Sequence, residues 1–365
     1  MNVQTVLMLD LGVTLRGGQR QVQYLARYLA RHAAREDEEP LFAPVIACPA
    51  ESALARAARE DGLQILPLPG RRVANPLIWV TLQQAVRRLK ARIIHTHDAH
   101  AAAIGAGLRA MSPHLLLVHS RRVSYQPASS LRMWKYRIAD AVVGVSREIA
   151  DGMIAAGVPA AKVHTIHSGI APETYEARRP HAAGAPFVFL SIGAMTPQKG
   201  FSVLLDAAAR LAAQPDLPPW KVRIAGDGEL MPALRRQCRE LGLETLAELP
   251  GRREGRQELP LCDAVVVPSV DGEGSSAAIK EAWATGVPLL ASDLASNQEL
   301  VRDEYNGLLA KNGDAESLAT GMRRLMTEPE LARRLVAGGA DTLPAFTDIR
   351  MAESYRLLYK SLLKP

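Results

Sequence analysis

The chain has 365 residues, of which 48% are hydrophobic, and this is enough apolar sequence for two globular domains with separate cores. Its net charge of +6 is uneven, because residues 1–185 carry 23 Lys and Arg against 14 Asp and Glu, whereas residues 186–365 carry 21 against 24. Only 5% of the residues are aromatic and no RNA-binding signature occurs, which argues against nucleic acid, and the lack of a bilayer-spanning run or signal peptide predicts a cytoplasmic protein.

Short β-branched runs alternate with segments of helical period along the first half. The predicted strands are residues 5–11, 42–48, 64–68, 91–97, 114–120, 141–146 and 162–168, and the helices between them include residues 19–34 and 79–91. This alternation predicts βαβ units on a parallel sheet. Residues 169–186 are rich in Pro, Gly and charge, and we interpret them as a linker.

The alternation resumes after the linker. Strands are predicted at residues 186–193, 220–226, 247–251, 264–269, 287–292 and 307–310, with helices at residues 200–213 and 229–242. The favoured fold is therefore α/β, with two doubly wound Rossmann-like domains whose strand ends face each other across a ligand-binding cleft. The predicted domains are residues 1–175 and 176–345. A helix at 346–365 has apolar residues at helical spacing and can pack on either domain, with a return to the first domain as one arrangement: Met351, Tyr355, Leu358 and Leu362.

Three cysteines are widely spaced along the chain. An odd number at this spacing fits neither a disulfide framework nor a structural zinc site. We expect buried, inert thiols at Cys48, Cys238 and Cys262.

Two glutamates flank a glycine-rich turn and a predicted helix start after the strand 264–269. Ser275 or Ser276 begins the helix, Glu273 stays in the loop and Glu281 lies about one and a half turns in. Free amides at such a helix start suit a phosphate, and carboxylates suit the diols of sugars or ribose. Spacing alone leaves a second interpretation open, in which both glutamates are ordinary surface residues.

Two other loops follow strands and precede helices. In one, Lys199 comes just before the helix start at Gly200 and can neutralise a phosphate. In the other, Gly17 and Gly18 allow the backbone to approach a ligand closely. Neither loop is a dinucleotide fingerprint or a Walker sequence, so hydride transfer and nucleotide hydrolysis lack their main signature.

A histidine-rich strand end lies at residues 93–100. Metal binding is one interpretation of His95, His97, Asp98 and His100, but no second cluster completes a site. A single histidine that contacts substrate, or an inert loop residue, explains the pattern better.

Six segments, in order along nearly the whole chain, resemble the GT-B-fold retaining glycosyltransferases of family 4, also called group 1. The segments in the first half are RGGQRQVQYLARYL, IIHTHDAH and ADAVVGVSREIADGMIAAGVPAAKVHTIHSGI. Those in the second half are SIGAMTPQKGFSVLLDA, VRIAGDGELMPAL and VVVPSVDGEGSSAAIKEAWATGVPLLASD, the last with the paired glutamates of the family.

The resemblance implies transfer of a sugar from a nucleotide-diphosphate sugar that is held mainly by the second domain. Glu281 would bind the ribose hydroxyls and Glu273 hydroxyls of the donor sugar. Lys199 would offset the charge that grows on the leaving diphosphate. The amides that would meet the diphosphate are those around Gly274, Ser275 and Ser276.

The resemblance also assigns roles in the first domain. His97 would contact the donor sugar as a catalytic residue, and the loop of Gly17 and Gly18 would approach the diphosphate. The family retains stereochemistry without a metal, the leaving phosphate being thought to take the proton of the acceptor. No metal or other cofactor is therefore expected.

The chain departs from the family pattern at three places. Ala194 occupies the position of a common arginine, so one diphosphate cation is missing, and we expect Arg252 or Arg253 to replace it. Ser168 and Ala171 stand where Asn and Asp are usual, and EGSS replaces EGFG.

Acceptors are expected on the first domain, where residues 119–137 combine five Arg or Lys with Tyr125, Trp134 and Tyr136. One interpretation is that Arg121 and Arg122 bind an anionic glycan or glycolipid of the lipopolysaccharide type, in peripheral contact with the inner face of the cytoplasmic membrane. The other interpretation is that residues 119–137 form an ordinary basic loop and helix.

Two further functions stay open. One is a sugar-nucleotide epimerase or phosphorylase of the same fold. The other is a non-catalytic GT-B partner that binds nucleotide without turnover, which the loss of arginine at Ala194 favours.

Overall fold

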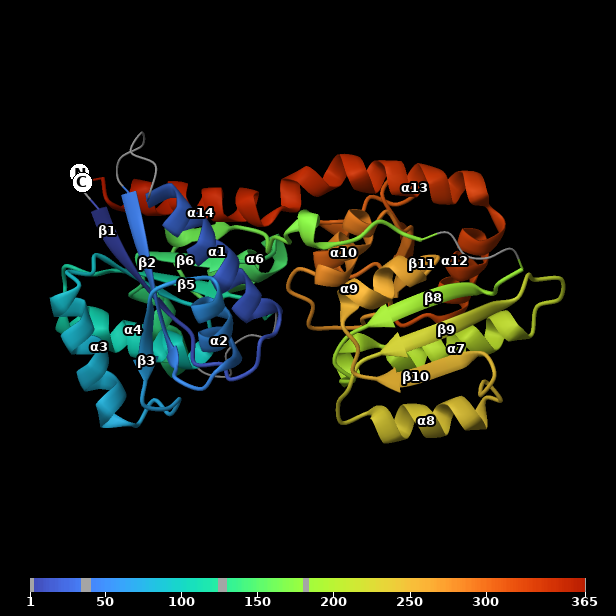
Figure 1. Ribbon diagram of the computed structural model, residues 1–365, viewed down its shortest axis with the longest axis horizontal. Coiled ribbons are helices and arrows are strands. Elements are labelled where there is room, and N and C mark those ends of the chain that lie inside the picture. Colours follow the sequence, from blue (N-terminus) through green and yellow to red (C-terminus); the bar gives the residue numbers. More distant parts are fainter. Residues whose placement is uncertain (1–2, 34–40, 124–129, 180–183, 365) are drawn as a thin grey trace. The chain divides into compact units, whose positions relative to one another are not determined.

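The computed structural model describes residues 3–33, 41–123, 130–179 and 184–364, which form two compact units (Figure 1). Unit 1 comprises Met1–Gly169 and Thr347–Pro365, and unit 2 comprises Ile170–Phe346. The first boundary thus lies six residues before the predicted position of 175, because the Gln21 side-chain amide exchanges two hydrogen bonds of 2.8 Å with the backbone of Gly169. The backbone N–H of Ile170 donates instead to Phe346, in unit 2.

Unit 1 contains a parallel seven-stranded sheet in the order β3-β2-β1-β4-β5-β6-β7. The strands are β1 (Val3–Leu9), β2 (Leu41–Pro49), β3 (Ile65–Leu68), β4 (Ile93–Thr96), β5 (Leu116–Arg121), β6 (Ala141–Gly144) and β7 (Val163–Thr165). Its α-helices are α1 (Gly17–Ala33), α2 (Ala53–Glu60), α3 (Pro76–Arg88), α4 (Ala99–Met111), α5 (Ser130–Arg137), α6 (Arg147–Ala155) and α14 (Asp348–Leu362). The strands are apolar along most of their length because helices cover both faces of such a sheet.

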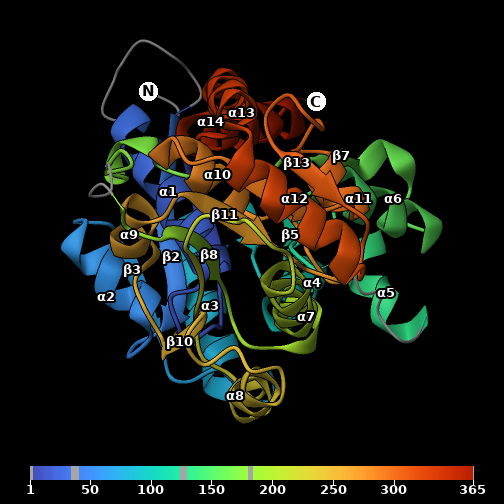
Figure 2. The same cartoon turned by 90° about the vertical axis from the view of Figure 1, so that its right-hand side faces the viewer.

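The C-terminal helix α14 lies beside α1 within unit 1 (Figures 1 and 2). The predicted apolar stripe is correct for Met351, Tyr355 and Leu358, which are buried. Tyr359 is also fully buried, and its hydroxyl reaches His95 at the end of β4. The helix is therefore part of the unit 1 core.

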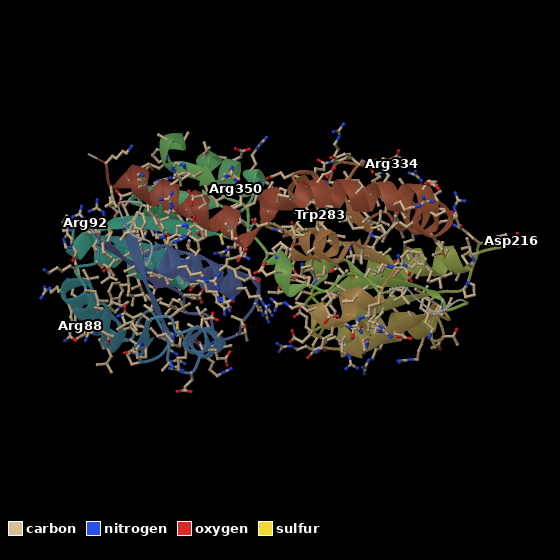
Figure 3. All side chains as sticks on the ribbon, turned by 45° about the horizontal axis from the view of Figure 1, so that its top comes forward. Arg88, Arg92, Asp216, Trp283, Arg334 and Arg350 are labelled. Atoms are coloured by element: carbon tan, nitrogen blue, oxygen red, sulfur yellow. The ribbon has the colours of Figure 1, made fainter. Side chains whose placement is uncertain are left out.

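Unit 2 contains a parallel six-stranded sheet in the order β10-β9-β8-β11-β12-β13. The strands are β8 (Phe187–Ile192), β9 (Trp220–Ala225), β10 (Ala247–Gly251), β11 (Ala264–Val267), β12 (Leu289–Ser292) and β13 (Leu308–Ala310). Its α-helices are α7 (Phe201–Ala212), α8 (Met231–Glu240), α9 (Gly255–Glu258), α10 (Ala277–Thr285), α11 (Ala295–Gln298), α12 (Ala315–Thr327) and α13 (Pro329–Thr342). Trp283, labelled in Figure 3, fixes α10 through an indole hydrogen bond of 2.8 Å to the carbonyl of Asn306.

The prediction of two doubly wound parallel-sheet domains is confirmed. The expected linker is wrong in part, because residues 170–179 pack onto unit 2. The N–H groups of Arg178 and Arg179 donate to the carbonyls of Thr285 and Pro260, and the Arg178 guanidinium pairs with Asp263. The remaining linker positions 180–183 lie outside the described residues.

Two further findings bear on function. All three cysteines are free and buried, as predicted. No helix among the described residues has the length and apolar character needed to cross a membrane.

Candidate active site

Two loops of unit 2 cross at the carboxyl ends of β8 and β11. The first, residues 193–200, ends at Gly200, whose φ of +64° is left-handed and whose Cα faces the carbonyl of Pro268 in the second. A Cβ at Gly200 would lie 1.9 Å from that oxygen, so only glycine allows this approach. The crossing is held by a hydrogen bond of 2.8 Å from Val270 N–H to the Gln198 carbonyl.

Lys199 and Glu273 meet at this crossing. The Lys199 Nζ lies 2.6 Å from Glu273 Oε1, and the Ser269 hydroxyl donates to the same oxygen at 2.5 Å. Burial alone would raise the pKa of Glu273, but the charge and hydrogen bond of Lys199, followed by the Ser269 hydroxyl and Lys280, hold it below its usual value. Glu273 is thus an ionised carboxylate with hydrogen-bonding capacity left on its second oxygen.

Lys280 lies one turn into α10 and is fully buried. Its Nζ donates to the Ser275 hydroxyl at 2.7 Å. Burial lowers the pKa of Lys280 to about 7, although the charges of Glu281 and Glu273 oppose the shift. Both carboxylates of the predicted pair therefore act on one ammonium group.

Glu281 has partners that come from two other segments. The Tyr175 hydroxyl donates to Glu281 Oε1 at 2.8 Å, and the Arg256 guanidinium lies 5.4 Å from the centre of the Tyr175 ring. The Arg256 Nε is buried and has no hydrogen-bond partner among the described residues. A carboxylate, a phenol and a cation are thus grouped beside the start of α10.

The start of α10, where an anion site is predicted, has no side-chain cap. Ser276 occupies the cap position but makes no side-chain cap hydrogen bond, while the Ser275 hydroxyl accepts from Lys280. Gly274 is buried next to Glu273. The first amides of the helix consequently lack a side-chain cap.

Arg252 does not join this group. Its side chain is exposed in the loop after β10, and Arg253 is exposed as well. Arg256, four residues further on, is the arginine of this segment that lies against Tyr175. Arg256 is a better candidate than Arg252 or Arg253 for the diphosphate cation that is missing at position 194.

Unit 1 brings His97, Arg122 and Gly18 together. The Arg122 guanidinium donates to His97 Nδ1 at 3.2 Å, and a Cβ on Gly18 would lie 3.3 Å from Arg122 Cδ. Burial, then the charges of His95 and Arg122, lower the pKa of His97 well below its usual value, so the ring is neutral. Because Nδ1 accepts a hydrogen bond, the proton resides on Nε2, which is buried without a partner among the described residues. His97 can therefore donate to a ligand hydroxyl.

His95 has a structural role. Its Nδ1 lies 2.5 Å from the Tyr359 hydroxyl and its Nε2 2.7 Å from the Ser120 hydroxyl, which also contacts Tyr355 at 2.7 Å. The His95 ring stands 3.9 Å from that of His97, centre to centre. Asp98 caps α4, and no group of three metal-ligating side chains occurs among the described residues.

Arg121 does not lie in an exposed basic loop, which corrects the expectation for residues 119–137. The strand β5 continues through this residue, which pairs with Gly144 of β6. The residue is only 6% exposed, and its guanidinium donates to the Tyr136 hydroxyl. Tyr125 lies outside the described residues, and a Cβ at Gly17 would point into open space.

Four residues near the site were missed by the sequence patterns. Tyr175 lay in the expected linker, and no sequence pattern singled out Arg256 or Lys280. Asp10, which directly follows β1, is fully buried and accepts from the N–H of Gly12 and from the side-chain amide of Gln19. Its place at the carboxyl end of a strand was the one available signal.

The chain is similar in sequence to two curated glycosyltransferases. The amylovoran biosynthesis glycosyltransferase AmsK of Erwinia amylovora is 30% identical over 208 residues, which is 55% of this chain and 48% of AmsK. The lipopolysaccharide core biosynthesis glycosyltransferase LpsE of Rhizobium meliloti is 32% identical over 161 residues, or 44% of this chain and 45% of LpsE. The matches thus span about half the length of these relatives.

A solved structure is similar along the whole chain. HepE of Anabaena, crystallised in complex with UDP-glucose, superposes with a TM-score of 0.83 at 20% identity and covers 98% of this chain and 99% of its own. This likeness shows the fold.

Two family models match successive parts of the sequence. Residues 15–174 match Glycosyltransferase Family 4, and residues 174–342 match Glycosyl transferases group 1. The two matches meet at residue 174 and together take in the site residues of both units, from Gly17 to Glu281. The chain belongs to the group 1 glycosyltransferases, family 4.

Proposed function

We propose that this protein is a retaining glycosyltransferase that moves a sugar from a nucleotide-diphosphate sugar to a glycan or glycolipid acceptor of the cell envelope. The observation that carries the proposal is the cluster of Lys199, Glu273 and Glu281 around the start of α10. Its parts match the parts of such a donor: carboxylates for sugar and ribose hydroxyls, and a cation with helix amides for the diphosphate.

The relatives support the donor and the acceptor class. HepE binds UDP-glucose, and AmsK and LpsE are named for the biosynthesis of amylovoran and of lipopolysaccharide core. We infer that the donor carries a uridine nucleotide, so UDP-sugars are the first donors to test.

The proposed chemistry follows from the charges at the site. The bond between the anomeric carbon and the diphosphate oxygen breaks, and the acceptor oxygen bonds to that carbon on the same face. The acceptor proton passes to the departing diphosphate. Lys199 and the amides near Ser275 stabilise the negative charge that grows on this group, with Arg256 as the second cation.

The remaining side chains position the donor. Glu281, oriented by Tyr175, takes the ribose diol, and Glu273 takes hydroxyls of the sugar. His97 donates from Nε2 to a sugar hydroxyl, and Arg122 holds the histidine in this tautomer. We expect no metal requirement, so chelation with EDTA should leave the rate unchanged.

Calorimetric titration of UDP tests the assignment of Glu281. Glu281→Ala should lower the affinity roughly tenfold or more, because a carboxylate that accepts two hydroxyl hydrogen bonds contributes about 1.5–3 kcal/mol. Glu330→Ala, which removes an exposed carboxylate on α13, is the matched control and should bind as the wild type does. Equal affinity for all three proteins would refute the assignment.

Turnover separates the proposal from its alternatives. A transferase should hydrolyse its donor slowly or transfer the sugar with retention at the anomeric carbon, which NMR of the product reports. Binding without turnover of UDP-, GDP- or ADP-sugars would favour the non-catalytic partner that Ala194 suggested. An interconverted nucleotide-sugar would indicate an epimerase, and phosphate-dependent release of a sugar phosphate would indicate a phosphorylase.

A further inference from the structure

One segment of unit 1 is basic and free of acidic residues. Residues 62–97 contain neither Asp nor Glu, although the chain as a whole has 38 of them. The same segment contains six basic residues: Arg71, Arg72, Arg87, Arg88, Lys90 and Arg92. All six are exposed, and none of them forms an ion pair with another described residue.

The helix α3 at the centre of this segment has one buried and one exposed face. Ile78, Leu82, Ala85 and Val86 are buried in the core. The exposed face consists of residues three or four positions apart in sequence, which are neighbours on a helix. Its first residues are also apolar: Leu77 is 59% exposed and Val80 is 52% exposed. It continues through Gln84 to Arg87 and Arg88.

The basic residues lie at both ends of α3. Arg71 and Arg72 belong to the loop 69–75 before the helix, which lines a surface hollow of about 530 Å³. Lys90 and Arg92 follow the helix, and Figure 3 shows Arg88 and Arg92 at the surface of unit 1. We call the six basic residues with Leu77 and Val80 the α3 surface.

We propose that the α3 surface docks unit 1 on an anionic lipid bilayer. Guanidinium and ammonium groups are attracted to lipid phosphates, and two exposed aliphatic side chains between them can enter the headgroup region. This goes beyond the proposed function: no residue of the surface belongs to the candidate active site. It also moves the expected membrane contact away from Arg121, which is buried.

The apolar part of the surface favours a bilayer over nucleic acid. A nucleic-acid site would add aromatic rings for stacking. The aromatic residue of α3, Trp79, is turned inward instead. Its indole N–H donates to the Val73 carbonyl at 2.7 Å, and its ring lies against Gly107 of α4.

Vesicle co-sedimentation of the full chain tests the proposal. The wild type should bind vesicles of phosphatidylcholine with phosphatidylglycerol, bind them more weakly at high salt, and bind pure phosphatidylcholine weakly. Arg87→Ser with Arg88→Ser should weaken binding by roughly 25-fold at low salt, as expected for two charges near an anionic surface. Leu77→Ser with Val80→Ser should weaken binding at both salt concentrations, because the apolar contribution is not screened.

A matched control removes the same charge elsewhere. Arg235 and Arg236 form another exposed arginine pair on a helix, α8 of unit 2, so Arg235→Ser with Arg236→Ser should bind vesicles like the wild type. All variants should keep the UDP affinity of the wild type, which separates this test from that of the donor site. Equal losses for both arginine pairs, or equal binding to neutral vesicles, would overturn the proposal. Binding to poly(U) but not to vesicles would assign the α3 surface to nucleic acid instead.

Discussion

The ammonium group of Lys280 is fully buried beside two carboxylates, and this arrangement has a pH signature. The pKa of a lysine in the unfolded chain is near 10.5, whereas burial lowers that of Lys280 to about 7. Between these values the unfolded state binds more protons than the folded state, so stability increases with pH. Lys280→Met removes this contribution.

We therefore predict that the melting temperature of wild type relative to Lys280→Met increases between pH 7 and pH 9. Differential scanning fluorimetry of both proteins at each pH measures the change. Lys311→Met, which replaces an exposed lysine of unit 2, should show a constant difference from wild type. A constant difference for Lys280→Met as well would show that Lys280 titrates as an ordinary lysine.

Single residues were predictable where they end a strand or begin a helix. Lys199, Glu273 and His97 lie in the loops between such strands and helices, and the structure places each beside other polar site residues. Tyr175 was not predictable, because its contact with Glu281 joins positions 106 residues apart and no local pattern encodes it. Arg121 was misjudged because β5 runs one residue past the predicted strand, which turns the side chain into the core.

At the scale of elements, the crossing of the two loops at Gly200 determines where Lys199 lies. We predict that Gly200→Ala destabilises the protein by about 2 kcal/mol or more and weakens UDP binding, because both the left-handed backbone and the Pro268 carbonyl oppose a Cβ. Urea denaturation and calorimetry measure the two effects.

Gly242→Ala is the control for backbone strain alone. Gly242 has a φ of +66° but no atom near its missing Cβ. We expect a loss of about 1 kcal/mol and an unchanged UDP affinity. If the two alanine variants behave alike, the loop crossing does not position Lys199.

The strands were largely predictable because a short β-branched run that is apolar on both faces is typical of a buried parallel strand and of few other structures. The predicted start of α7 at Gly200 is one residue from the observed start at Phe201. The segment 170–179 was not predictable. Its Pro and charge resemble a linker, but its backbone groups and Arg178 find partners on unit 2.

At the scale of the whole molecule, unit 1 is discontinuous and depends on α14. Deletion of residues 347–365 would expose the α1 face that α14 covers and leave His95 and Ser120 without the hydroxyls of Tyr359 and Tyr355. We predict that unit 1 loses its cooperative melting transition while unit 2 keeps its own. Hydrogen exchange measured by mass spectrometry resolves the two units.

A shorter deletion, of residues 364 and 365, should leave both transitions intact, since Lys364 is exposed. Protection of β4 and β5 that survives the longer deletion would show that unit 1 folds without α14.

The number of domains followed from the interruption of the βα alternation, but the partner of α14 did not. Its apolar stripe fitted either domain. The choice depends on tertiary complementarity, including the hydroxyls of Tyr355 and Tyr359 and a hydrogen bond from the Tyr28 hydroxyl of α1 to the Glu353 carboxylate. Such polar matches between distant segments have no periodic signature.

The return of α14 to unit 1 has a consequence for synthesis on the ribosome. All residues of unit 2 leave the exit tunnel before α14 does, although most of unit 1 was translated first. Unit 2 is continuous in sequence, so all residues of its core are available before α14 is synthesised. In unit 1, Phe42 and the ring of His95, against which Tyr359 packs, stay uncovered until α14 has left the tunnel. Unit 1, although most of it is translated first, is thus the later of the two units to be completed.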